Sequence, residues 1–151
     1  MSFDDLAKRI AKMARELGNK EQTQKVATAA AEIVKERTNR GFGVAQNNGP
    51  KKRLKPLSAN YKKQRKKLPL GPKARPSRSN LNQTGEMVES VKGKGSKNLA
   101  EVRLTGENNK KKAIDQVKAG RSFMNLAKSE IKKVVNTIEE QINNDIKKNG
   151  L

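Results

Sequence analysis

Residues 37–85 decide how this chain is organised, and they read RTNRGFGVAQNNGPKKRLKPLSANYKKQRKKLPLGPKARPSRSNLNQTG. This stretch holds 14 Lys and Arg residues and no Asp or Glu, and it also holds all five prolines and five of the eleven glycines. The whole chain has a net charge of +20, so the remaining residues carry 21 cations and 15 anions, a net of only +6. A block of like charge extends by self-repulsion and suits the neutralisation of a polyanion. The alternative interpretation is a solvated surface loop whose charge keeps the chain in solution.

The local pattern of this stretch predicts a long basic loop over residues 40–80 with one helical island. Glycines and asparagines between residues 41 and 50 interrupt any regular element. A short helix then follows Ser58, whose hydroxyl is suited to an N-cap, and continues as far as Lys67. We expect Tyr61 and Leu68 to anchor this helix. Prolines beyond it forbid its continuation.

Residues 1–39 show the periodicity of two helices. Apolar residues recur at three- and four-residue spacing in the first, which Gly18 ends: Phe3, Leu6, Ile10, Met13, Ala14 and Leu17. The second helix, over residues 21–39, is expected to place one set of residues on a common face: Val26, Ala30, Ile33, Val34 and Arg37. Its run of alanines gives a thin surface that suits close packing.

Residues 81–126 are predicted to form short helices and a β-hairpin. A short helix is expected close to Thr84. Residues 100–104 alternate apolar and polar side chains, which is typical of a strand with one buried face. We expect the turn at residues 93–98 and a weaker partner strand at 90–94. A further helix, at residues 108–119, is expected to face inward through its apolar members: Ala113, Ile114 and Val117.

The last helix, within residues 127–149, has the clearest apolar stripe, and this stripe is almost purely Ile and Val: Ile131, Val134, Val135, Ile138, Ile142 and Ile146. We expect its first half to pack on the N-terminal helices and the hairpin. The second half, Ile142 and Ile146, is predicted to be an assembly interface with a neighbouring subunit or joining protein.

Composition bounds the fold and excludes several chemistries. A chain of 151 residues favours a single domain over residues 1–151, and the elements predict an α+β fold that is mainly helical, with a small antiparallel β-hairpin or sheet and a long basic loop. The chain has no Cys and no His, so thiol nucleophiles, disulfides, imidazole catalysis and Cys/His zinc sites are excluded. No segment has signal-peptide or transmembrane character, so we expect a soluble protein made in a cytoplasm.

No arrangement of residues points to catalysis. The adjacent pairs Asp4-Asp5 and Glu139-Glu140 diverge by about 100° on a helix and form no two-carboxylate site. Residues 93–96, GKGS, lack the spacing of a phosphate-binding loop and fall in a predicted hairpin turn. We therefore expect no enzyme, no metal and no cofactor.

The candidate site is the set of cations in the basic loop, which would contact phosphates or an acidic partner without reading sequence. Its members are Lys51, Lys52, Arg53, Lys55, Lys62, Lys63, Arg65, Lys66, Lys67, Lys73, Arg75 and Arg78.

Three motifs give the chain a family resemblance. They are KPLSANY at residues 55–61, followed by a Lys/Arg run, NLNQTGEMVES at residues 80–90, and GRSFMNL at residues 120–126. In this order they resemble the virion morphogenesis or tail-completion proteins of tailed bacteriophages, and the resemblance covers roughly residues 33–140. Where that family has Ser after the last motif, this chain has Ala127, so Glu130 is expected to lack its capping-box partner.

The resemblance implies an α+β structural component of the virion without catalysis. It implies a tail-completion or head–tail joining (neck) protein that assembles as part of a ring, located in the virion and, during assembly, in the host cytoplasm. The implied partners are neck and tail proteins: the tail terminator, the connector, the tube or the tape measure. The basic loop would then meet packaged DNA or the acidic wall of a neighbouring protein. Composition alone leaves an alternative open, a free, sequence-independent nucleic-acid-binding protein of ribosomal or nucleoid type.

Overall fold

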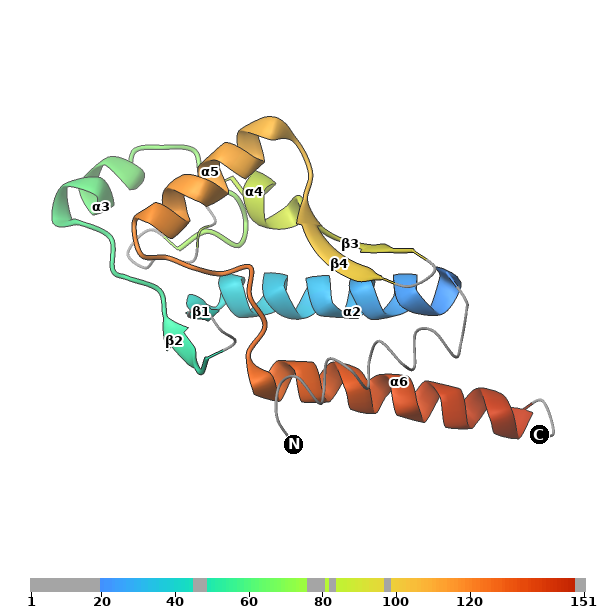
Figure 1. Ribbon diagram of the computed structural model, residues 1–151. Helices are drawn as coiled ribbons and strands as arrows, with labels where there is room; N and C mark the ends of the chain where they lie inside the picture. The colour runs from blue at the N-terminus through green and yellow to red at the C-terminus, as the bar shows by residue number, and fades with distance from the viewer. Residues whose placement is uncertain (1–19, 45–48, 76–80, 82–83, 97–98, 149–151) are drawn as a thin grey trace.

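The computed structural model describes residues 20–44, 49–75, 81, 84–96 and 99–148 (Figure 1). Its elements, in chain order, are α2 (Lys20–Asn39), β1 (Phe42–Val44), β2 (Lys51–Arg53), α3 (Ala59–Arg65), α4 (Glu86–Glu89), β3 (Val91–Gly95), β4 (Ala100–Leu104), α5 (Glu107–Lys118) and α6 (Lys128–Lys148). The strands form two antiparallel pairs, β1 with β2 and β3 with β4. The predicted α+β, mainly helical fold is therefore confirmed. The helix predicted within residues 1–18 lies outside the described residues.

Helix α2 is the centre of the structure. The β3–β4 hairpin lies along one side of it and α6 along another (Figure 1). On the first side, Ala31 and Val34 of α2 meet Val91 and Phe123 in one buried cluster. On the second, Ala30 packs with residues of α6. The alanines that gave α2 its high helix propensity thus also let two layers approach its backbone closely.

The β3 strand lies directly against the backbone of α2, and two glycines make this approach possible. A Cβ atom added to Gly93 would lie 2.1 Å from the carbonyl carbon of Ala27, and one added to Gly95 would lie 2.2 Å from the backbone nitrogen of Gln24. Both glycines were expected in a turn at residues 93–98, which was wrong, although Gly93 was also included in the expected partner strand at residues 90–94, which β3 confirms. Both belong to β3, and an added side chain on either would meet the α2 backbone.

Helix α6 buries the first half of its apolar stripe, as predicted: Ile131, Val134, Val135 and Ile138. Val134 and Ile138 pack with Ala30 of α2, and Val102 of β4 borders the same cluster. The prediction that this half packs on the N-terminal helices and the hairpin is therefore confirmed for α2. The side chains of Ile142 and Ile146 lie outside the described residues, so the predicted interface stays a prediction.

Helix α5 confirms its predicted position but not its predicted orientation. Ala113 is buried against Phe123 and Met87, as expected. Ile114 and Val117, however, are 53% and 42% exposed, so the expectation that they point inward was wrong. The face that packs runs through Asn109 and Ala113, one helical turn apart, and leaves the other two on an open side.

A buried ion pair joins the end of α2 to the start of α6. Arg37 donates from Nη1 to Oε2 of Glu130 at 2.5 Å and from Nη2 to the carbonyl oxygen of Phe123. Burial lowers the pKa of Arg37, and Glu130 counteracts this shift, so the guanidinium stays charged. Glu130 also accepts the backbone N–H of Ala127 at 2.8 Å. Half of a capping box therefore forms without the Ser hydroxyl that the family motif would place there.

Candidate polyanion-binding arm

Residues 51–75, which hold most of the cations in the described part of the basic loop, are called the basic arm. It leaves the body from a small hairpin that the sequence did not predict, β1–β2, in which Phe42 faces Arg53. The Arg53 guanidinium carbon lies 5.6 Å from the centroid of the Phe42 ring, a cation–π contact. The hairpin is fixed to the body where Val44 donates its N–H to the Ser122 carbonyl at 3.2 Å. The arm therefore starts from an ordered base.

Two apolar side chains and one arginine hold the next part of the arm. Leu54 and Leu57 are both buried. Arg121, in the α5–α6 connection, donates from Nε to the Lys55 carbonyl at 3.1 Å and from Nη2 to the Pro56 carbonyl at 3.2 Å. A planar guanidinium suits this task because its donors form a rigid fork. Two of the motifs that carry the family resemblance, at residues 55–61 and 120–126, thus lie in direct contact.

Helix α3 is the predicted helical island. Ser58 caps it, since its side chain accepts the N–H of Tyr61 at 3.2 Å. Lysines and Arg65 occupy its last turn, where positive charge is favoured by the helix dipole. The predicted anchors were wrong, because Tyr61 and Leu68 are 38% and 42% exposed. Figure 1 shows α3 at one end of the molecule, far from the C-terminal part of α6.

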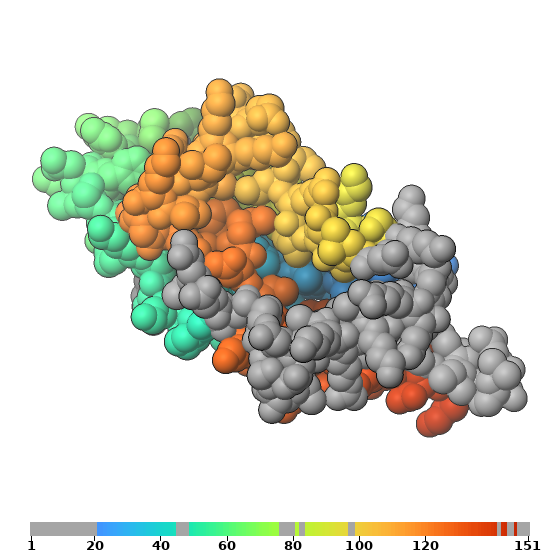
Figure 2. Space-filling view, in the orientation of Figure 1, coloured from blue at the N-terminus to red at the C-terminus, as the bar shows by residue number. Residues whose placement is uncertain are grey.

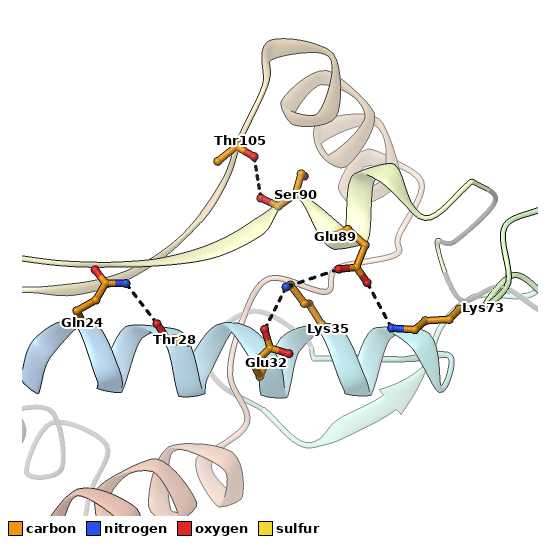
Figure 3. Close-up of polar contacts among 8 residues, drawn as sticks. All are labelled: Gln24, Thr28, Glu32, Lys35, Lys73, Glu89, Ser90 and Thr105. Atoms are coloured by element: carbon orange, nitrogen blue, oxygen red, sulfur yellow. Dashed lines mark hydrogen bonds and ion pairs between the residues drawn. The ribbon is translucent and has the colours of Figure 1, made fainter. Parts of the chain in front are cut away.

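The far end of the arm is also tied to the body. Lys73 forms an ion pair with Glu89 at 3.4 Å, and the second carboxylate oxygen of Glu89 lies 3.8 Å from Lys35 of α2 (Figure 3). Lys35 in turn contacts Glu32 at 3.1 Å. Close by, Gly71 lies so near to Thr84 that an added Cβ atom would be 2.6 Å from its carbonyl oxygen. The arm is thus a loop held at both ends.

The arm exposes most of its cations. Nine of its eleven Lys and Arg side chains are exposed: Lys51, Lys52, Arg53, Lys55, Lys63, Lys66, Lys67, Lys73 and Arg75. Lys62 is half-buried, and Arg78 lies outside the described residues. Among the described residues, Lys73 is the member of this exposed set with a carboxylate partner. The predicted set is thus largely available to an external polyanion.

Arg65 differs from the rest of the predicted set. Arg65 was predicted to contact a polyanion together with the other cations. It is only 3% exposed, so an external phosphate cannot reach it. Burial lowers the pKa of its guanidinium, while the nearby Tyr61 acts in the opposite direction. Arg65 lines an open cleft of about 730 Å³ between α3, α4 and α5, together with Met87 and Arg121. Arg65 therefore does not belong to the exposed cationic surface of the arm.

The described residues contain neither a candidate metal site nor a candidate membrane span. They include no group of three or more acidic, His or Cys side chains placed to hold a metal ion. Over the same residues, no helix has both the length and the apolar character needed to cross a bilayer. No protein-family model, curated protein or solved structure matches the chain.

Proposed function

We propose that this chain is a structural component of a tailed-phage virion, a tail-completion or head–tail joining protein, and that its basic arm contacts a polyanion at the joint. The proposal rests on one observation above all: the arm holds nine exposed cations on a loop that is tied to the body at both ends. A loop so anchored presents its charge in a fixed place, as a repeated part of a ring must. The order of the three sequence motifs supports the phage setting.

Packaged DNA is the first polyanion to consider, since phosphate contacts require positive charge but no sequence readout. An acidic surface of a neighbouring neck or tail protein would bind the same cations of the arm. The alternative function, a free nucleic-acid-binding protein, is favoured by the same exposed cations. The two functions differ in whether the chain is built into particles.

The polyanion contact is tested by the salt dependence of DNA binding. If about six arm cations meet phosphates, log K falls with log salt with a slope of about −5. Replacing Lys62, Lys63, Lys66 and Lys67 by Gln should flatten this slope by up to about 3.6, because each lost phosphate contact contributes about 0.9. Arg65 is left in place, since it is buried.

A matched control removes the same charge from another surface. Lys128, Lys132, Lys133 and Lys147 are four exposed lysines of α6, and their replacement by Gln changes net charge equally. We expect this control to keep most of the original slope. If the two variants flatten the slope equally, net charge, and not the arm, attracts DNA. If the arm variant keeps the slope of the original chain, the arm is assigned to contact with protein.

A further inference from the structure

A groove with an apolar floor and a basic rim lies beside β4, on the side of the molecule where α5 and the hairpin meet (Figure 2). It has a volume of about 1090 Å³. The floor includes Val102, Leu104, Met124 and the two exposed side chains of α5, Ile114 and Val117. Apolar side chains gathered in this way mark a contact surface more often than isolated ones do.

The charged residues that line this groove are all cationic. Five of its lining residues are cationic, Lys92, Lys94, Arg103, Lys110 and Lys118, and none of the described lining residues is acidic. Arg103 and Lys110 each have a carboxylate partner, Glu101 and Glu107 respectively. Within the described residues no ion pair involves the other three. The rim therefore complements a ligand with acidic side chains.

The hydrogen-bond pattern of the hairpin shows which backbone groups face outward. Thr105 donates its N–H to the Ser90 carbonyl at 3.0 Å, so these opposite residues form a hydrogen-bonded pair. Because such pairs alternate along an antiparallel ladder, Arg103 and Glu101 also bond to β3. The N–H and C=O groups of Ala100, Val102 and Leu104 therefore point away from β3.

The two edges of the hairpin differ in whether their outward backbone groups have hydrogen-bond partners. On the β3 edge, the side-chain amide of Gln24 donates to the Gly93 carbonyl at 2.9 Å and accepts the Gly95 N–H at 2.8 Å. This side chain occupies the place of a neighbouring strand. On the β4 edge, no strand among the described residues pairs with the outward groups. An unpaired edge of this kind is a template for an added strand.

We propose that β4 and the adjoining groove bind an extended, acidic segment of a partner protein, which adds to the hairpin as a third strand. Its backbone would pair with Val102 and Leu104, and alternate apolar side chains would cover Ile114 and Val117. Its acidic side chains would meet the lysines of the rim. DNA would leave the apolar floor uncovered, and a helical segment would leave the β4 edge unpaired. This surface is separate from the basic arm and does not depend on the function proposed for it.

The test uses a short synthetic peptide in which Glu alternates with Val or Ile, and the full chain labelled for NMR. We expect saturable binding, with slowed amide hydrogen exchange at Val102 and Leu104. Arg103, whose amide already bonds to β3, should keep its exchange rate. A peptide of the same composition with its residues at helical spacing should bind more weakly, and a peptide with Lys in place of Glu should not bind.

Two variants separate this surface from general charge attraction. Ile114→Lys with Val117→Lys alters exposed positions, so the fold is expected to persist, and peptide affinity should fall by about tenfold or more. Lys66→Gln with Lys67→Gln, in the basic arm, should leave peptide affinity unchanged. The proposal is overturned if the alternating peptide shows no saturable binding, or if the arm variant, and not the α5 variant, loses binding. It is also overturned if the helical-spacing peptide or the Lys peptide binds as tightly as the alternating one. A slowing of exchange that does not alternate along β4, with Val102 and Leu104 protected and Arg103 unchanged, would overturn it too.

Discussion

The buried pair Arg37–Glu130 should be the most sensitive polar contact of the fold. Both residues are 5% exposed, and Arg37 also satisfies the Phe123 carbonyl. In Arg37→Met the Glu130 carboxylate loses its counter-charge in a place that water does not reach. Loss of one partner of a buried pair typically costs about 3–5 kcal/mol of unfolding free energy. For a chain of this length, that is a fall in Tm of about 6–20 °C.

The measurement is urea unfolding followed by circular dichroism, for Arg37→Met, for Glu130→Gln and for the double variant. The glutamine that replaces Glu130 in the double variant still has an oxygen to accept the Ala127 N–H, and no buried charge remains. The double variant should therefore be more stable than Arg37→Met alone. The exposed pair Arg40–Glu36, on the same helix end, gives the control, and Arg40→Met should cost at most about 1 kcal/mol.

The reasoning fails if the effects of replacing Arg37 and Glu130 on the free energy of unfolding are independent of each other. Variants of residues in contact normally show a coupling free energy of about 0.5–3 kcal/mol. If the losses for Arg37→Met and Glu130→Gln simply add in the double variant, the buried pair has no special role. The same conclusion would follow if Arg37→Met and Arg40→Met had equal effects.

Two further predictions concern packing and assembly. Gly93→Ala should cost about 3 kcal/mol or more, because its new Cβ meets the α2 backbone, whereas Gly120→Ala, in open space at a φ of 79°, should cost only about 1–2 kcal/mol. Similar thermal melts for these two variants would refute the close approach of β3. Ile142→Asp with Ile146→Asp should leave a folded monomer that fails to join particles, and Val134→Asp, at a buried site, should unfold the domain. Should the double variant melt as early as Val134→Asp, the distal stripe is core.

Elements with a strong local signal could be predicted from the sequence. The Ile and Val stripe of α6 predicts both the helix and its buried face. Ser58 after Pro56 predicts the start of α3, and alternation predicts β4. In each case the determining contacts lie within a few residues, so the periodicity itself carries the information.

Features that depend on distant partners could not be predicted in the same way. Gly95 was predicted to be a turn residue, because nothing in its neighbourhood shows that the backbone of α2 lies against it. Arg65 reads as one more surface cation, yet the fold buries it beside Tyr61. The strands β1 and β2 are only three residues long, and β2 is KKR, which has no apolar alternation. For α5, helical spacing indicates an apolar face but not which neighbour covers it.

The candidate site likewise has one feature that could be predicted from the sequence and one that could not. Its composition was evident from the sequence, because a stretch with 14 cations and no acid is unusual on any chain. Its anchoring was not, because Arg121 reaches carbonyl groups 65 and 66 residues away in the sequence. The motifs at residues 55–61 and 120–126 hold both partners of this contact, but the sequence shows only their order along the chain and not that they meet.

On the proposed function, this chain is encoded by a tailed phage, and a cryo-EM map of the mature particle of that phage tests the central claim most directly. The account predicts density for the chain at the head–tail joint, repeated as a ring. The exposed lysines of residues 51–75 should face DNA or an acidic surface of a neighbouring subunit. A complete map in which other proteins account for the whole joint, and from which this chain is absent, would contradict it.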